Sequence, residues 1–217
     1  MGKGKGDSES LLKTMKRKGN LTSRRVEDAI RRIPRHKFVP EGLEEEAYSD
    51  SPLPIGYDQT VSQPSVVAKM TELLDPQKGQ SILEIGTGSG WQAAILGTLV
   101  GEDGKVFTVE RIEELSRMAR ENLASVDLDN VYVVNGDGSV GLKEHAPYDR
   151  ILCTAASPRI QEDWLEQLKV GGRIVSPVGS GFVQSMVVVE KTGKGETETL
   201  RNERGYRFVK LKGEKGL

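Results

Sequence analysis

The stretch that most constrains the fold of this chain is residues 82–90, which read ILEIGTGSG. A short apolar run leads directly into alternating glycines, Gly86, Gly88 and Gly90, and the next run, WQAAILGTLV, has a helical composition. A strand, a glycine turn and a helix in this order are typical of a ligand-binding unit in an open α/β sheet. Glycines permit backbone angles that a Cβ atom disfavours, and they let a ligand approach the main chain closely.

The spacing of the glycines separates two classes of ligand. A dinucleotide site has the pattern G-x-G-x-x-G with a pyrophosphate at the helix start, whereas this chain has G-x-G-x-G preceded by Glu84. A carboxylate repels a phosphate and attracts a cation. Because S-adenosylmethionine carries an ammonium and a sulfonium group but no phosphate, the motif favours this cofactor. A tight strand-to-helix connection without a ligand remains the alternative on local pattern alone.

Length, charge and cysteine content exclude several other classes of protein. The 217 residues are enough for one domain with a sizeable core, and 31 basic residues nearly balance 32 acidic ones, so no strong field points to nucleic acid. The single cysteine, Cys153, excludes an internal disulfide and is expected in the core, and no Cys and His cluster suggests a metal site. Without a membrane-spanning run or a secretory signal, we expect a cytoplasmic protein without a membrane partner.

Beyond residue 60 the chain alternates expected helices and strands. Apolar runs predict strands at residues 82–85, 105–109, 131–134, 149–154, 171–179, 186–189, 197–200 and 207–211. Helical spacing predicts helices at residues 64–74, 91–100, 112–126 and 162–168. This order implies a mostly parallel, doubly wound sheet with antiparallel pairing at one edge. The tail, residues 213–217, is expected to fray.

The first 60 residues have a different pattern. Helices are expected at residues 10–18, ended by Gly19, and from a cap at Thr22 to a stop at Pro34. Prolines and glycines between residues 40 and 64 predict a long irregular segment, a kind of loop that is often functional. Residues 1–6 are expected to be disordered.

Ser62 lies just before the helix that Pro64 is expected to begin. Unpaired N–H groups and the positive end of the helix dipole favour an anion at such a position. Two interpretations are open: Ser62 caps the helix, which is worth about 1 kcal/mol, or it holds a substrate carboxylate. The local chemistry by itself favours the cap.

Two acidic residues, each directly after an expected strand, indicate the same cofactor site as the glycine turn. Glu110 ends the strand at 105–109, at the distance beyond the glycines where a carboxylate accepts ribose hydroxyls, although it can also be a helix-start charge. Asp137 follows the next strand, where the adenine end of a cofactor is expected. Ligands of open α/β sheets bind beyond the carboxyl ends of the strands. The glycine turn, Glu110 and Asp137 therefore predict one cofactor site.

Several longer runs resemble a known family, the protein-L-isoaspartate O-methyltransferases. The resemblance extends from about residue 26 to residue 211 and rests on AYSDSPLPIGYDQTVSQP, LEIGTGSGWQAAIL, VERIEEL, GDGSVG, APYDRILCTAA, GGRIVSPVG and RFVKL. Many methyltransferases share the glycine motif. The run LPIGYDQTVSQP is the specific signature, because it lies outside the generic cofactor-binding core.

The resemblance implies a fold and an activity. The fold is a Rossmann-like class I S-adenosylmethionine-dependent methyltransferase with an N-terminal helical extension. A single domain would span residues 1–217, with helices and a substrate lid in 1–60 and the cofactor core in 61–217. The activity is methyl transfer to the free α-carboxylate of isoaspartyl residues in damaged proteins and peptides, which leaves S-adenosylhomocysteine and an ester that closes to a succinimide. A monomer is expected.

The resemblance also implies site residues. Ser62 matches the serine assigned to the active site. The implied cofactor contacts are Thr60, Val61, Glu84, Gly86, Thr87, Gly88, Ser89, Gly90, Glu110, Arg111, Asp137 and Gly138.

The implied chemistry suits a chain with only two histidines. A carboxylate acceptor with a pKa of about 3.5 is already ionised at neutral pH, so no general base is needed. The site must align acceptor oxygen, methyl carbon and sulfur, and such positioning can supply roughly 7–11 kcal/mol. We expect Ser62 to orient the carboxylate by a hydrogen bond.

The rival functions are methylation of a small molecule or RNA, NAD-dependent oxidation, and ligand binding without turnover.

Overall fold

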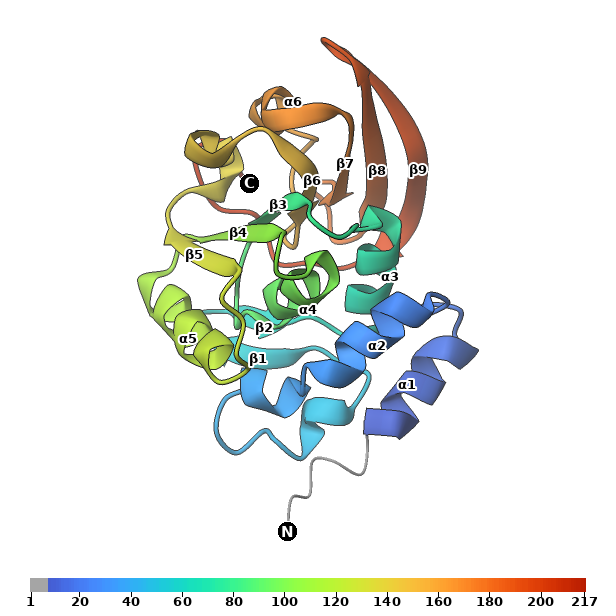
Figure 1. The fold of residues 1–217 in the computed structure, drawn as a ribbon, viewed down its shortest axis with the longest axis vertical. Helices are drawn as coiled ribbons and strands as arrows, with labels where there is room; N and C mark the ends of the chain where they lie inside the picture. The colour runs from blue at the N-terminus through green and yellow to red at the C-terminus, as the bar shows by residue number, and fades with distance from the viewer. Residues whose placement is uncertain (1–7) are drawn as a thin grey trace.

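A seven-stranded sheet forms the centre of the computed structural model, which describes residues 8–217 (Figure 1). The expected disorder of residues 1–6 lies outside this range. The strand order is β5-β4-β3-β6-β7-β8-β9, in which the first five strands are parallel and the last two pair antiparallel. The strands are β3 (Ser81–Ile85), β4 (Lys105–Glu110), β5 (Val131–Asn135), β6 (Tyr148–Cys153), β7 (Leu168–Val178), β8 (Gln184–Gly193) and β9 (Glu196–Tyr206). The predicted parallel sheet with an antiparallel edge is confirmed.

Helices cover both faces of the sheet, as a continuously apolar strand such as β3 requires. Side chains alternate along β3, so Ile82 packs with Met70 and Leu96 on one face, while Leu83 packs with Trp164 on the other. The first face carries α3 (Pro64–Leu74), α4 (Trp91–Val100) and α5 (Glu113–Ala124), and the second carries α6 (Glu162–Gln167). Cys153 is buried within β6, as predicted.

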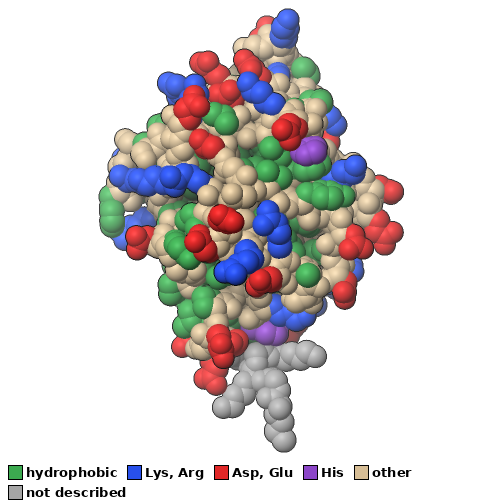
Figure 2. Space-filling view, turned by 90° about the vertical axis from the view of Figure 1, so that its left-hand side faces the viewer, with side chains coloured by type: hydrophobic (Ala, Val, Ile, Leu, Met, Phe, Trp, Pro, Cys, Tyr) green, Lys and Arg blue, Asp and Glu red, His purple; other side chains and the backbone are tan. Residues whose placement is uncertain are grey.

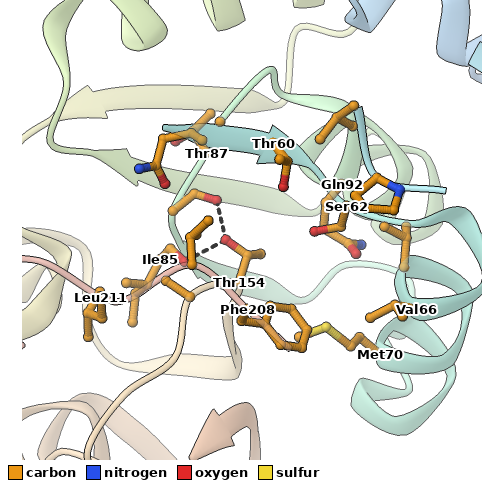
Figure 3. Close-up of a pocket in the computed structure, with 18 of the residues that line it drawn as sticks. Thr60, Ser62, Val66, Met70, Ile85, Thr87, Gln92, Thr154, Phe208 and Leu211 are labelled. Atoms are coloured by element: carbon orange, nitrogen blue, oxygen red, sulfur yellow. Dashed lines mark hydrogen bonds between the residues drawn. The ribbon is translucent and has the colours of Figure 1, made fainter. Parts of the chain in front are cut away.

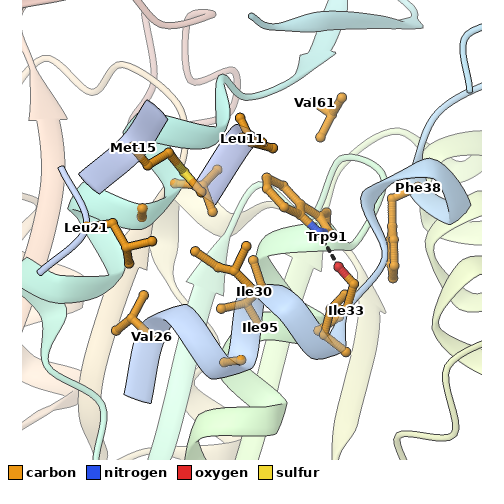
Figure 4. Packing of buried hydrophobic residues seen from close by; sticks show 14 of the residues in the cluster. Leu11, Met15, Leu21, Val26, Ile30, Ile33, Phe38, Val61, Trp91 and Ile95 are labelled. Atoms are coloured by element: carbon orange, nitrogen blue, oxygen red, sulfur yellow. Dashed lines mark hydrogen bonds between the residues drawn. The ribbon is translucent and has the colours of Figure 1, made fainter. Parts of the chain in front are cut away.

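The N-terminal helices pack on α3 and α4 rather than on the sheet. They are α1 (Ser8–Arg17), α2 (Arg24–Arg32) and the short 3-10 turns η1 (Arg35–Phe38) and η2 (Glu46–Tyr48). Leu11, Met15 and Ile30 form a cluster with Trp91 and Ile95 of α4 (Figure 4). This confirms the predicted N-terminal helical extension.

Two predictions for the N-terminal part are wrong, both because long-range contacts replace local ones. Ser23 caps α2 by accepting from the Val26 N–H, while the Thr22 hydroxyl donates to Glu72 of α3 instead. The segment expected to be irregular contains a hairpin of β1 (Leu53–Gly56) and β2 (Gln59–Val61). Its turn places Tyr57 and Asp58 at positive φ, a conformation that composition alone did not indicate.

The C-terminal part also departs from prediction. β9 is an eleven-residue edge strand, far longer than the expected 197–200, whereas residues 207–211 form no strand. They cross the carboxyl ends of the sheet, held by hydrogen bonds between Ala156 and the main chains of Val209 and Leu211. The tail does not fray, because Asp137 accepts from the Glu214 N–H at 2.7 Å and Ser139 accepts from the Lys215 N–H at 3.0 Å.

The surface gives no sign of a single dominant charge on the face seen in Figure 2, where basic and acidic side chains are interspersed. No helix within residues 8–217 has both the length and the apolar character needed to cross a membrane. The same residues include no group of three or more His, Cys, Asp or Glu side chains placed to hold a metal ion.

Asp50 provides a test of how the start of α3 is held. Its carboxylate accepts from the Ser65 N–H at 2.9 Å and from the Ser65 hydroxyl at 2.6 Å, and Lys18 pairs with it at 2.5 Å. We expect Asp50→Ala to lower the free energy of unfolding by about 1–2 kcal/mol, the usual range for a lost helix cap. Urea unfolding measures this change. Asp28→Ala removes an exposed carboxylate of α2 and serves as the control; an equal loss in both variants would contradict the assignment.

Candidate active site

A cavity of about 670 Å³ opens at the carboxyl ends of β3, β4 and β6. Its walls come from β2 and the start of α3, from the glycine turn after β3, from the end of β4, and from residues 205–212 (Figure 3). The carboxyl ends of β3 and β6 belong to neighbouring strands whose crossover connections run in opposite directions along the sheet. A ligand is expected at such a switch point.

The glycine turn is shaped by a contact with Thr154, the residue after β6. The Thr154 hydroxyl donates to the Gly86 carbonyl at 2.6 Å, and a Cβ atom at Gly86 would lie 2.4 Å from that hydroxyl oxygen. Gly86 also has a φ of 92°, in the left-handed region. Gly86 and Gly88 line the cavity, whereas Gly90 lies behind the turn against Ala119 of α5. Sequence reasoning placed Thr154 in a strand and missed it as a lining residue.

Glu110 joins the turn to the next helix. One carboxylate oxygen accepts from the Gly88 N–H and the other from the Ile112 N–H, both at 3.0 Å. Glu110 therefore bonds the residue before α5, as the helix-start interpretation predicts, and its side chain also lines the cavity. Each carboxylate oxygen retains a lone pair, so the group can still accept from a vicinal diol. Arg111 lines the cavity beside it.

Glu84 does not line the cavity, contrary to the interpretation that its charge faces the cofactor. It is fully buried beneath the turn, where one oxygen lies 2.5 Å from the Thr108 hydroxyl, which in turn lies 2.7 Å from the Thr87 hydroxyl. The other oxygen has no partner within the described residues. Burial raises the pKa of Glu84 to about 8, and the nearby charge of Glu110 acts in the same direction. Glu84 is therefore neutral at pH 7 and supports Thr87 from below.

Asp137 and Gly138 are neighbours in the sequence, but only Gly138 lines the cavity. The Asp137 carboxylate points to the tail and to Ser139, whose N–H it binds at 2.9 Å, so it does not line the cavity. Gly138 does line it, pressed so closely on Ile85 that a Cβ atom would lie 2.8 Å from that side chain. Only the main chain of the GDG run thus reaches the cavity. The residues missed on this side are those of 205–212, whose position depends on the folded tail.

The opposite end of the cavity contains Ser62 beside Gln92, and Val66, Met70 and Phe208 also line the cavity (Figure 3). The cap of α3 is Gln63, without a side-chain bond, so the interpretation of Ser62 as a cap is wrong. Its hydroxyl has no hydrogen-bond partner among residues 8–217. Thr60 and Val61 of β2 line the wall beside it.

The N–H groups at the start of α3 are already occupied. Ser65 donates to Asp50, Val66 and Val67 donate to the Gln63 carbonyl, and Pro64 has no N–H. The Ser62 hydroxyl therefore remains as a candidate donor for the predicted anion, while the helix N–H groups do not.

The lining residues fit S-adenosylmethionine. The hydroxyl oxygen of Ser89 is buried without a partner in the described part of the chain, and it lies at the start of α4, where a carboxylate is favoured. Glu110 suits a ribose diol, and the apolar Ile85 and Val109 offer a surface for a purine. A parallel sheet with this turn and this cavity defines a class I S-adenosylmethionine-dependent methyltransferase.

Comparisons with known proteins define the family. The model of the protein-L-isoaspartate(D-aspartate) O-methyltransferases matches residues 6–216. The chain is 51% identical to a protein-L-isoaspartate O-methyltransferase of Methanopyrus kandleri, over 96% of this chain and 92% of that protein, and 49% identical to one of Archaeoglobus fulgidus, over 96% and 94%. The chain belongs to the protein-L-isoaspartate(D-aspartate) O-methyltransferase family.

Solved structures share the fold of this chain. A protein-L-isoaspartate O-methyltransferase superposes with a TM-score of 0.87 at 31% identity, covering 96% of this chain and 67% of that one. A putative protein-L-isoaspartate O-methyltransferase from Plasmodium falciparum, solved with S-adenosyl-L-homocysteine, shares the fold with a TM-score of 0.81 at 21% identity, covering 95% and 99%.

The buried Glu84 predicts an unusual pH dependence of stability. The unfolded chain loses this proton near pH 4.5 and the folded chain near pH 8, so wild-type stability should fall as pH rises through that window. Glu84→Gln has no proton to lose. We expect its stability relative to wild type to rise between pH 5 and pH 8, by at most about 1.4 kcal/mol per pH unit.

Urea unfolding at pH 5, 6.5 and 8 measures this difference. The exposed Glu121→Gln is the control for the loss of a carboxylate on α5. A stability difference between Glu84→Gln and wild type that stays constant with pH would show that Glu84 is ionised in the folded protein.

Proposed function

We propose that the two ends of this cavity hold the donor and the acceptor of one methyl transfer. As a member of its family, the protein transfers a methyl group from S-adenosylmethionine to the free α-carboxylate of L-isoaspartyl residues in proteins and peptides, which begins repair through a succinimide. When bound, S-adenosylmethionine supplies a methyl group made electrophilic by its positively charged sulfur. The observation that supports the two-ended site is that Ser62 and the glycine turn line the same cavity.

The acceptor needs orientation rather than deprotonation. An α-carboxylate is ionised at neutral pH, and none of the described residues that line the cavity is a histidine. His36 bonds the Tyr48 hydroxyl at 2.8 Å, and His145 stacks on Phe107 at 4.0 Å. Neither histidine is placed to act as a general base.

Ser62 orients the acceptor by donating a hydrogen bond to one carboxylate oxygen, which leaves the other oxygen free to attack. Its hydroxyl has no partner within residues 8–217, whereas the N–H groups of Ser65, Val66 and Val67 are already occupied. The apolar side chains of Val66, Met70 and Phe208, which line the same cavity, limit the access of water to it. Loss of charge by the attacking carboxylate is easier where water is excluded.

At the cofactor end of the cavity, different residues contact different parts of S-adenosylmethionine. Glu110 accepts from the ribose hydroxyls, the Gly138 main chain faces the purine, and Gly86, Thr87, Gly88 and Ser89 lie along the methionine portion. Thr60, Val61 and Arg111 complete the wall. Glu84, Gly90 and Asp137 contribute from outside the cavity: Glu84 supports Thr87, Gly90 packs on α5, and Asp137 holds the tail.

The hairpin of β1 and β2 serves as a fixed wall over the turn, since Ile55 comes within 3.4 Å of a Cβ atom built on Gly88.

We also propose that residues 1–217 act as one methyltransferase domain and as a monomer, because a single chain supplies every wall of the cavity. The free Cys153 is compatible with a cytoplasmic enzyme.

The reaction is tested with a matched pair of peptides that differ only in an isoaspartyl or an aspartyl linkage. The isoaspartyl peptide should be methylated at least roughly 10²-fold faster in kcat/KM, because misplacement of the acceptor by about 1 Å can have an effect of this size. Methyl-ester formation from labelled S-adenosylmethionine measures both rates. Equal rates would contradict an isoaspartyl-specific site.

The role of Ser62 is tested by Ser62→Ala. We expect kcat to fall by roughly 10²-fold, as when one positioned donor is removed from an active site, with unchanged affinity for S-adenosylhomocysteine. Steady-state kinetics and calorimetry measure the two quantities. Ser125→Ala, at the exposed end of α5, is the control and should behave as wild type. Full turnover in Ser62→Ala would rule out the proposed role.

A further inference from the structure

Arg35 is a buried cation that lies outside the cavity and has no part in the mechanism above. Its side chain is 1% exposed. Nη1 donates to the carbonyls of Ala47 at 2.6 Å and Ser49 at 3.4 Å, and Nη2 donates to those of Ser51 at 3.0 Å and Ser62 at 3.2 Å. Burial lowers the pKa of Arg35 to about 10, so the group stays charged at neutral pH.

The same guanidinium contacts the other wall of the cavity. It lies 5.2 Å from the centre of the Trp91 ring, within range of a cation–π interaction. Trp91 is the first residue of α4, directly after the glycine turn, and its indole N–H donates to the Ile33 carbonyl at 3.3 Å (Figure 4). Arg35 therefore bridges the main chain of Ser62 and the helix that begins at the glycine turn.

The bonding pattern specifically requires arginine. A planar guanidinium can donate in several fixed directions, whereas a lysine ammonium is a compact charge that cannot reach all of these carbonyls while stacked on an indole. Burial of a charge is unfavourable unless hydrogen bonds compensate it. Here four carbonyls accept from Nη1 and Nη2, while Nε has no partner among the described residues. Asp50, which adds a favourable charge, holds Ser65 on the other side of Ser62. The segment that presents the Ser62 hydroxyl is thus held on both sides.

We propose that Arg35 is a positioning residue for methyl transfer: it holds the main chain of Ser62 at a set distance from the glycine turn, and through it the Ser62 hydroxyl. This inference rests on the proposed role of Ser62. It differs from a purely structural role in one respect. A residue that acts through the Ser62 hydroxyl loses its effect on turnover when that hydroxyl is absent.

A double-mutant cycle with Arg35→Lys and Ser62→Ala tests the proposal. We expect Arg35→Lys to lower kcat by roughly 10²-fold, because small displacements of a reacting group have effects of this order. Affinity for S-adenosylhomocysteine, measured by calorimetry, should stay at the wild-type value. In the Ser62→Ala background, Arg35→Lys should lower kcat little further. Arg32→Lys, an exposed neighbour in α2, is the control and should match wild type.

Each outcome decides between the two hypotheses. Full turnover in Ser62→Ala overturns the role of Ser62 and, with it, this inference. If Ser62→Ala is impaired but Arg35→Lys is fully active, or lowers kcat equally with and without the Ser62 hydroxyl, only the role of Arg35 is overturned.

A second variant applies if Arg35→Lys does not fold. Arg35→Gly with added guanidinium, well below denaturing concentrations, refills the space and restores the donors. We expect guanidinium to raise kcat when Ser62 is present and to leave kcat unchanged in the Arg35→Gly, Ser62→Ala double variant. Restored thermal stability without restored turnover overturns the proposal.

Discussion

The contact between Thr154 and Gly86 sets the point at which the sheet opens into a cavity. The threonine hydroxyl bonds the Gly86 carbonyl at 2.6 Å and leaves no room for a side chain there. β3 lies between β4 and β6, so their carboxyl ends surround this point. Glu110 binds the turn from the β4 side through the Gly88 N–H. A ligand above the turn therefore meets main chain and small polar groups, on a surface held from both neighbouring strands.

Three buried ionisable groups hold the walls of the cavity, each through different contacts. Glu84 is neutral at pH 7, because burial raises the pKa of its carboxyl, and it supports Thr87 through Thr108. The two carboxylate oxygens of Glu110 accept hydrogen bonds from the main-chain N–H groups of Gly88 and Ile112. Arg35 stays charged, and its Nη1 and Nη2 atoms donate hydrogen bonds to main-chain carbonyls, including that of Ser62. Glu110 and Arg35 bond the main chain of segments outside the helices and strands, whereas Glu84 reaches the glycine turn only through Thr108.

Prediction from the sequence succeeded where local pattern and tertiary environment agree. The strands β3 to β6, the glycine turn and the helices α3, α4 and α5 lie where the sequence predicts them, because each is set by spacing over a few residues. It failed where a distant partner replaced a local one. Glu72 takes the Thr22 hydroxyl, Asp50 occupies the start of α3 in place of Ser62, and Asp137 holds the tail rather than facing the cavity. Such partners are 50, 15 and 77 residues apart in sequence, beyond any local signal.

The amino-acid sequence by itself determined the α/β class, the position of the cofactor turn and the family, since these follow from periodicity, glycine spacing and extended matching runs. Only the tertiary structure decided which implied residues reach the cavity. It left Glu84, Gly90 and Asp137 outside and brought Thr154 and residues 205–212 inside. The sequence alone does not fix this because the direction of a side chain at the carboxyl ends of the strands depends on which donor or acceptor it pairs with. That pairing is chosen among groups far apart in the chain, after the sheet has brought them together.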